Sequence, residues 1–228
     1  MSWWKRLRLA PSKPSASDRL HSARIGLPGW TEEQGTPGLR AWRDPDGSVL
    51  SLAAPEGPLE LPSTSDEPGI RAFARSIAES RWAGLIEACA ETGALGEGLR
   101  FIYKRLQKPA YIFTGMLLLS RPEGPYVWTV VDRERGTTGV REAIITSELF
   151  NTGRLTVEEY ERSWARDPYE PEYRGVDRSI LRFVSDNESY DARFPDHPLS
   201  KVRRTLAALP VSVQFETPLK RRWTLYPC

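Results

Sequence analysis

The sequence predicts an α+β fold in which an antiparallel sheet, made of a hairpin and a four-stranded meander, is packed by helices like an α/β/α sandwich. Four apolar segments of strand length follow one another over residues 84–132 with short, turn-rich connections. Amphipathic helical patterns lie before and after them. A parallel crossover needs about a dozen residues or more, so the short connections require antiparallel neighbours.

The size and composition of the chain suit one packed core. It has 228 residues, of which 39% are hydrophobic and 27% charged, and we expect a single α+β domain over residues 25–217. A flexible basic N-terminal segment over residues 1–24 and a basic-aromatic C-terminal tail over residues 218–228 would flank it. The start lacks the apolar stretch of a signal peptide, and no run approaches the roughly 20 apolar residues of a membrane span. We therefore expect a cytoplasmic protein.

The predicted hairpin and first helix come from turn chemistry and periodicity. Residues 39–42 and 49–52 flank a stretch with Asp44-Pro-Asp-Gly47, whose proline and glycine favour a turn. Two aspartates two positions apart also occur in calcium loops, but the longer ligand series is missing, so we interpret them as a turn. Apolar residues then recur at helical spacing and predict an amphipathic helix over residues 69–82.

The meander strands are predicted from apolar runs separated by glycine- and proline-rich turns. The most apolar run, residues 112–119, predicts a central strand. The predicted strands cover residues 84–92, 99–106, 111–120 and 126–132.

The remainder is predicted to be mostly helical. A helix over residues 140–150 would turn Val140, Ile144 and Leu149 towards the sheet. The capping-box pattern that begins at Thr156 predicts a second helix. A last helix over residues 199–209 would stop at Pro210, and an alternating strand would follow it.

The order of elements resembles that of PsbP/DcrB-like proteins. The resemblance covers residues 27–215 and depends on two stretches besides the element order: Trp42-Arg-Asp-Pro-Asp-Gly-Ser-Val-Leu-Ser51, and Arg133-Glu-Arg-Gly-Thr-Thr-Gly-Val-Arg-Glu142. The second stretch is also similar to uncharacterised bacterial proteins. The resemblance implies an α/β/α sandwich on an antiparallel sheet, used mainly for binding, as in lumenal photosystem subunits, lipoproteins and chaperone-adaptors of secretion effectors. Fold alone does not fix function.

Positive charge is concentrated at the two ends of the chain, where large aromatic residues accompany it. This mixture suits a protein interface, whereas the acidic middle of the chain would repel a nucleic-acid backbone. Trp3, Trp4 and Leu7 could share a helical face, which allows weak contact of the N-terminus with a membrane surface. No pattern indicates the oligomeric state. The candidate partner-binding residues are Trp3, Trp4, Arg221, Arg222 and Trp223.

The loop between the last meander strand and the next helix is the candidate ligand site. Backbone N–H groups and the positive end of a helix dipole could meet a phosphate or carboxylate there, with arginines adding charge. The loop matches neither a P-loop nor a dinucleotide motif, and Thr137 or Thr138 as a plain helix N-cap explains the same residues. The candidate ligand-binding residues are Arg133, Arg135, Gly136, Thr137, Thr138, Gly139 and Arg141.

Signatures of catalysis, metal binding and cofactor binding are missing from the sequence. There is no Gly-x-Ser-x-Gly elbow and no metal-ligand spacing. His197 follows several carboxylates, and the cluster could hold a cation or supply a general base, or could simply cap a helix before Pro198. We expect Cys89 to be a small buried side chain. The sequence thus predicts a non-enzymatic protein-binding module of the adaptor, chaperone or immunity type. The alternative is a protein or enzyme that binds a small anion at residues 133–142.

Overall fold

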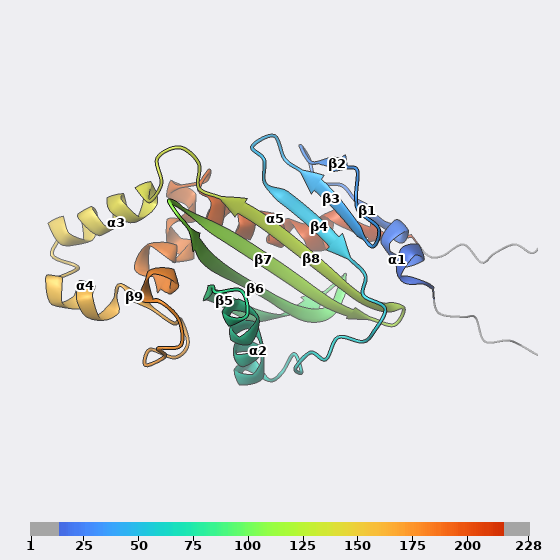
Figure 1. Cartoon of the computed structure of the whole chain (residues 1–228), viewed down its shortest axis with the longest axis horizontal. Helices are drawn as coiled ribbons and strands as arrows, with labels where there is room; N and C mark the ends of the chain where they lie inside the picture. The colour runs from blue at the N-terminus through green and yellow to red at the C-terminus, as the bar shows by residue number, and fades with distance from the viewer. Residues whose placement is uncertain (1–13, 217–228) are drawn as a thin grey trace, which may run out of the picture.

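A seven-stranded antiparallel sheet in the order β2-β3-β4-β8-β7-β6-β5 forms the centre of the computed structural model, which describes residues 14–216 (Figure 1). The meander β5–β8 forms as predicted, and the hairpin β3–β4 joins it through pairing of β4 with β8. The strands are β2 (Thr31–Glu33), β3 (Leu39–Arg43), β4 (Val49–Ala53), β5 (Gly84–Gly93), β6 (Gly96–Gln107), β7 (Ala110–Arg121) and β8 (Gly124–Arg133).

The hairpin turn is stabilised by an aspartate, as its sequence predicts. The Asp44 carboxylate accepts hydrogen bonds from the Ser48 backbone N–H at 2.7 Å and from the Ser48 hydroxyl at 2.8 Å. Gly47 has φ +86°, a left-handed conformation that glycine adopts without steric cost. The interpretation of this stretch as a turn is confirmed.

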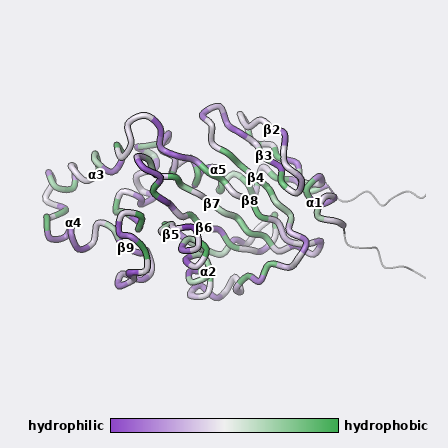
Figure 2. Tube along the Cα trace, in the orientation of Figure 1, coloured by the Kyte–Doolittle hydropathy of each residue, from purple (hydrophilic) through white to green (hydrophobic). Residues whose placement is uncertain are grey.

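Helices cover both faces of the sheet, which gives the α/β/α layering. On one face lies α5 (Pro198–Ser212), with Leu199, Val202, Leu206 and Leu209 buried against the sheet. On the other lies α2 (Glu67–Glu79), which buries Ile70, Ala74 and Ala78 against β5, β6 and β7. Figure 2 shows hydrophobic residues in the middle of the strands and hydrophilic ones in the loops. The predicted fold class is confirmed.

Close contact between α5 and the sheet depends on a glycine in the central strand. A Cβ atom on Gly115 of β7 would lie 2.5 Å from Leu206 Cδ1 and 2.6 Å from Val202 Cγ1. The missing side chain therefore lets α5 approach the strand. Residues 112–119 of β7 are all buried, as expected of a central strand covered on both faces.

The helices after the sheet do not pack on it as predicted. In Figure 1, α3 (Val140–Asn151) and α4 (Val157–Ser163) extend beyond one end of the sheet. Val140 and Ile144 are 43% and 40% exposed, so the prediction that they face the sheet is wrong. Ile145 and Leu149 are buried instead, in a separate small core, the end lobe. The end lobe includes β9 (Ala165–Arg166), β10 (Arg182–Phe183) and the short 3-10 helices η1 (Arg178–Ile180), η2 (Val184–Asp186) and η3 (Glu188–Arg193).

The described ends of the chain pair with each other. Part of the segment predicted to be flexible forms α1 (Ala16–Ser22), and β1 (Ala23–Ile25) pairs with β11 (Val213–Phe215). Arg19 on α1 is buried and donates hydrogen bonds to the Pro125 and Pro55 carbonyls at 2.8 and 2.6 Å. The flexible segment expected over residues 1–24 therefore cannot extend past the start of α1.

Two further features complete the described chain. α5 continues through Pro210 to Ser212, so the predicted stop at Pro210 is wrong; a proline in the last turn removes only one helical hydrogen bond. Within residues 14–216, no helix has the length and hydropathy to cross a membrane.

Candidate functional site

The predicted loop borders an open groove of about 690 Å³ between the end of β8 and the start of α5. Arg133, Arg135, Thr137 and Arg141 of the predicted set line it. Cations outnumber acids among the lining residues, and exposed apolar atoms of Val140 lie beside them. The other lining residues are Asp46, Glu134, Val140, Arg193, Phe194, Pro195, Asp196, His197, Pro198 and Lys201.

Most cations around the groove already have acidic partners. The Nη1 atom of Arg135 lies 2.7 Å from Oδ1 of the buried Asp132. Arg193 pairs with Glu148, and Lys201 with Asp46. Arg133 is exposed, and its guanidinium has no ion pair or hydrogen bond within the described part of the chain. Arg133 is therefore the groove cation that is free to meet a partner.

The N-terminus of α3 is occupied by a carboxylate of the protein itself. Neither Thr137 nor Thr138 caps the helix; the N-cap is Gly139, with φ +73° and no side-chain cap. Glu134 accepts hydrogen bonds from the backbone N–H of Gly139 at 2.8 Å and of Tyr111 at 2.9 Å. Burial raises the pKa of Glu134, but the neighbouring His197 ring and the hydrogen bonds from these N–H groups outweigh it and lower the pKa. The carboxylate thus takes the place expected for an external anion.

Arg141 is a structural residue in this arrangement. Its side chain is 2% exposed and donates to the Ser185 carbonyl at 2.8 Å, the Asn187 carbonyl at 2.9 Å, and Asp191 and Ser200 at 2.9 Å. These bonds tie α3 to η2, η3 and α5. Four of the five guanidinium N–H groups of Arg141 are used in these bonds.

Behind the groove lies a buried polar cluster, formed by Lys104, Tyr111, Glu134, Arg141, Glu142, Asp186 and His197. The Lys104 ammonium lies 2.5 Å from Asp186 Oδ2 and 3.1 Å from the centre of the Phe183 ring. Burial lowers the pKa of Lys104 and raises that of Glu142. Burial, followed by the negative charge of Glu142, raises the pKa of Tyr111 to about 12.

The buried polar cluster has no space for a substrate. Its free volume is about 10 Å³, which is at most enough space for one water molecule. His197 faces it but acts as the N-cap of α5, since its Nδ1 atom accepts a hydrogen bond from the Leu199 N–H at 3.2 Å. Perturbed pKa values often mark functional sites, but buried ion-pair networks produce them too. The hydrogen bond from the Leu199 N–H confirms that His197 caps α5.

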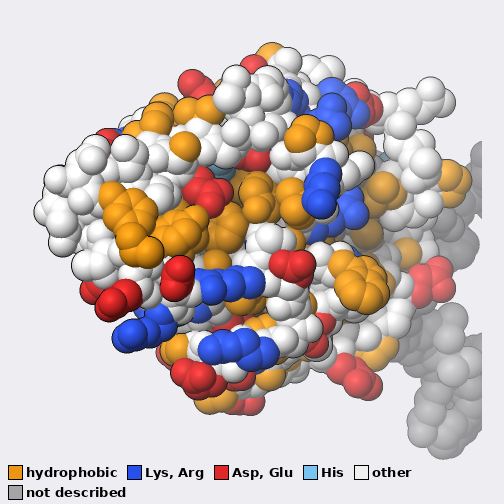
Figure 3. All heavy atoms as spheres, turned by 60° about the vertical axis from the view of Figure 1, so that its left-hand side comes forward, with side chains coloured by type: hydrophobic (Ala, Val, Ile, Leu, Met, Phe, Trp, Pro, Cys, Tyr) orange, Lys and Arg blue, Asp and Glu red, His pale blue; other side chains and the backbone are white. Residues whose placement is uncertain are grey.

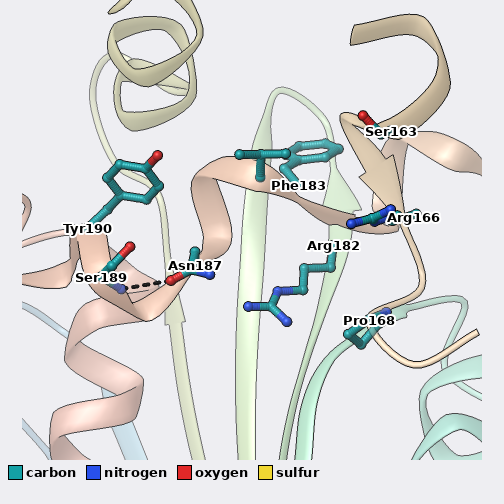
Figure 4. Close-up of a pocket in the computed structure, with 9 residues that line it drawn as sticks. Ser163, Arg166, Pro168, Arg182, Phe183, Asn187, Ser189 and Tyr190 are labelled. Atoms are coloured by element: carbon teal, nitrogen blue, oxygen red, sulfur yellow. Dashed lines mark hydrogen bonds between the residues drawn. The ribbon is translucent and has the colours of Figure 1, made fainter. Parts of the chain in front are cut away.

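A second hollow, the end-lobe pocket, has a volume of about 290 Å³ and lies between α4, β9, β10 and η3 (Figure 4). Arg182 reaches from β10 into the space between the two sides of the pocket. No sequence pattern predicts this pocket, because its lining is spread over residues 163–190 without a motif. The pocket is lined by Ser163, Arg166, Pro168, Arg182, Phe183, Val184, Asn187, Ser189 and Tyr190.

The remaining residues singled out by the sequence are two residues of the loop, Cys89 and the terminal aromatic and basic residues. Gly136 has φ +68° and open space around it, and the Thr138 hydroxyl donates to the Pro109 carbonyl at 3.2 Å. The prediction of a buried Cys89 is wrong: its side chain is exposed, with Sγ 3.6 Å from Arg100 Nη2. The candidate partner-binding residues Trp3, Trp4, Arg221, Arg222 and Trp223 lie outside the described residues.

These features define an α+β protein with an antiparallel sheet between helical layers and an open groove at one end. No family model and no curated protein matches the sequence. Among solved structures, the chain is similar to the Saccharomyces cerevisiae Ran-binding protein Mog1p, with 6% identity over 56% of this chain and 78% of that chain and a TM-score of 0.35.

Two further solved structures give similar values. A variant of the protein Mog1 shares 9% identity over 86% of this chain and 92% of that chain, with a TM-score of 0.39. LpqN, involved in cell envelope biogenesis of Mycobacterium tuberculosis, shares 10% identity over 60% of this chain and 80% of that chain, with a TM-score of 0.29. The fold class follows from the strand order and helix packing described above, and the resemblance to PsbP/DcrB-like proteins stays a prediction.

Proposed function

We propose that this chain is a non-enzymatic binding module of the adaptor, chaperone or immunity type, and that the groove beside residues 133–142 receives an acidic segment of a protein partner. One observation carries the proposal. The ionisable side chains that converge at this end of the sheet leave only about 10 Å³ between them, whereas the neighbouring groove is open and has about 690 Å³.

The lining of the groove favours a protein segment as its occupant. Protein interfaces are rich in arginine and aromatic residues. Here Arg133 and Arg135 lie near the apolar Phe194 and the partly exposed Val140. Figure 3 shows hydrophobic side chains among charged ones on the face that includes this end of the molecule. An acidic partner segment would pair with Arg133 and cover the apolar atoms.

Site-specific photo-cross-linking in native cells tests the proposal. A photoreactive residue at Thr137, which is exposed in the groove, should yield a defined cross-linked protein. The same residue at Ser76, exposed on α2, serves as the control. Arg133→Glu should weaken the Thr137 cross-link because it reverses the free charge. The proposal would be contradicted if the photoreactive residue at Thr137 gave the same cross-linked products as the one at Ser76, or if Arg133→Glu left the Thr137 products unchanged.

The alternative occupant is a small anion at the same loop. The free guanidinium of Arg133 favours it, whereas Glu134 already occupies the helix terminus. In that case phosphate compounds should raise the melting temperature of the full chain, and Arg133→Ala or Arg135→Ala should abolish the rise.

The terminal residues remain candidates for a second contact with a partner. They are Trp3, Trp4, Arg221, Arg222 and Trp223. Deletion of residues 1–10 removes Trp3 and Trp4 and so tests these two.

A further inference from the structure

The end-lobe pocket contains two arginines that occupy opposite positions on neighbouring strands and have no ion-pair partner within residues 14–216. Arg166 of β9 and Arg182 of β10 are directly paired in the antiparallel register. Like charges placed opposite each other on neighbouring strands are destabilising. Within residues 14–216, neither guanidinium has an ion pair or a hydrogen bond. The fold thus places two arginines at opposite strand positions, and no acidic side chain of the described residues pairs with either one.

No acidic side chain in the lining of this pocket would repel an oxyanion. No aspartate or glutamate lines it, although the chain contains 30 acidic residues. The groove beside residues 133–142, by contrast, has acids among its lining residues. The absence of acids is therefore specific to the end-lobe pocket and is not a general property of the surface.

Unused hydrogen-bond donors lie on the side of the pocket opposite Arg166 (Figure 4). The side chain of Asn187 accepts a hydrogen bond from the Ser189 backbone N–H at 3.0 Å, so its amide N–H groups remain free to donate. The hydroxyls of Ser189 and Tyr190 have no hydrogen-bond partner in the described chain. The Ser163 hydroxyl is already used, because it donates to the Glu159 carbonyl at 2.7 Å.

We propose that the end-lobe pocket binds a phosphate dianion, either as free phosphate or as the phosphate group of a small phosphomonoester. Two guanidinium groups match the charge of about −1.5 to −2 that a phosphomonoester carries at neutral pH, and arginine suits the geometry of phosphate oxygens. Pro168, Phe183 and Val184 supply apolar surface against which an organic group would pack. Bound phosphate would also relieve the repulsion between Arg166 and Arg182.

Calorimetric titration of the full chain at constant ionic strength, with sodium phosphate and with phenyl phosphate, tests the proposal. Arg166→Gln and Arg182→Gln should each weaken binding at least tenfold. Arg105→Gln and Arg154→Gln, at exposed arginines outside the pocket, should leave binding unchanged. Tighter binding of phenyl phosphate would identify a phosphomonoester site, and equal binding a site for free phosphate. No binding at millimolar concentration, or equal loss in the control variants, would overturn the proposal.

A measurement without ligand separates binding from a structural role. Each glutamine variant removes one of two like charges at opposite strand positions. Arg166→Gln and Arg182→Gln should therefore melt at or above the temperature of the unmodified chain at low ionic strength. A drop of several degrees would show that the arginines stabilise the fold through other contacts, and would overturn the assignment. Since this pocket and the groove share no lining residue, the result is independent of the proposed function.

Discussion

Lys104 on β6 and Asp186 on η2 form an ion pair with 2.5 Å between Nζ and Oδ2, although 82 positions separate them in the sequence. Their side chains are 1% and 5% exposed. The Asp186 carboxylate also accepts a hydrogen bond from the Phe183 backbone N–H at 2.8 Å. This pair joins the sheet to the end lobe beside Phe183 and Val184, which line the end-lobe pocket.

Removal of one partner of this pair should destabilise the chain strongly. Lys104→Met leaves Asp186 buried and unpaired, and Asp186→Asn does the same to Lys104; each should lower the free energy of unfolding by about 3–5 kcal/mol. The double variant Lys104→Met/Asp186→Leu should recover much of the loss, because it leaves no buried charge. Urea unfolding checks this, and simple additivity of the two single changes would contradict it.

Arg141 should matter for stability and not for ligand contact. Arg141→Ala removes the hydrogen bonds that tie α3 to η2, η3 and α5 and leaves Asp191 with fewer partners, so we expect a loss of about 3–5 kcal/mol. Arg141→Lys keeps the charge but not the planar fork and should recover only part of it. Arg133→Ala, on the exposed neighbour, is the control and should change the unfolding free energy by less than about 0.5 kcal/mol.

Glu142 should make stability fall as pH rises above its ordinary pKa. Burial raises the pKa of Glu142 above 4.5, so the folded chain holds a proton that the unfolded chain has already released. This contribution to stability is complete below pH 4.5 and is lost as the pH rises through the raised pKa.

Glu142→Gln tests this pH dependence. Glutamine cannot ionise and can still accept the hydrogen bond of the Trp164 indole N–H, which lies 3.3 Å away. The variant should therefore gain stability relative to the unmodified chain as the pH is raised through the window. Chemical unfolding at a series of pH values measures the difference. The exposed Glu97→Gln should show no such trend, and parallel curves for the Glu142 variant would refute the prediction.

Gly115→Ala should separate α5 from the sheet. The added Cβ atom would come within 2.6 Å of two side chains on α5, and overpacking of this kind costs about 1–3 kcal/mol. Gly93→Ala is the matched control, because its Cβ would meet nothing within 4 Å. Thermal unfolding compares the two. Equal melting temperatures would show that α5 tolerates the extra methyl group.

Local sequence patterns were sufficient to predict the meander strands, the hairpin turn, the α2 helix and the capping box at Thr156. Each depends on periodicity or on a few neighbouring residues, such as the contact of Asp44 with Ser48. The capping box forms as its spacing predicts, with Glu159 accepting from the Thr156 backbone N–H at 2.8 Å. Local chemistry of this kind survives folding, because its partners are already close along the chain.

Only the tertiary structure decided how charges and hollows are distributed. The sequence treated Arg133, Arg135 and Arg141 alike, yet folding buries Arg141, pairs Arg135 with Asp132 and leaves Arg133 free. Ion pairs such as Lys104–Asp186 join residues that are remote in sequence. The sequence by itself therefore determined the strands and turns, which follow from local periodicity. Burial and pairing depend on distances in space, and these exist only once the end lobe has packed against the sheet.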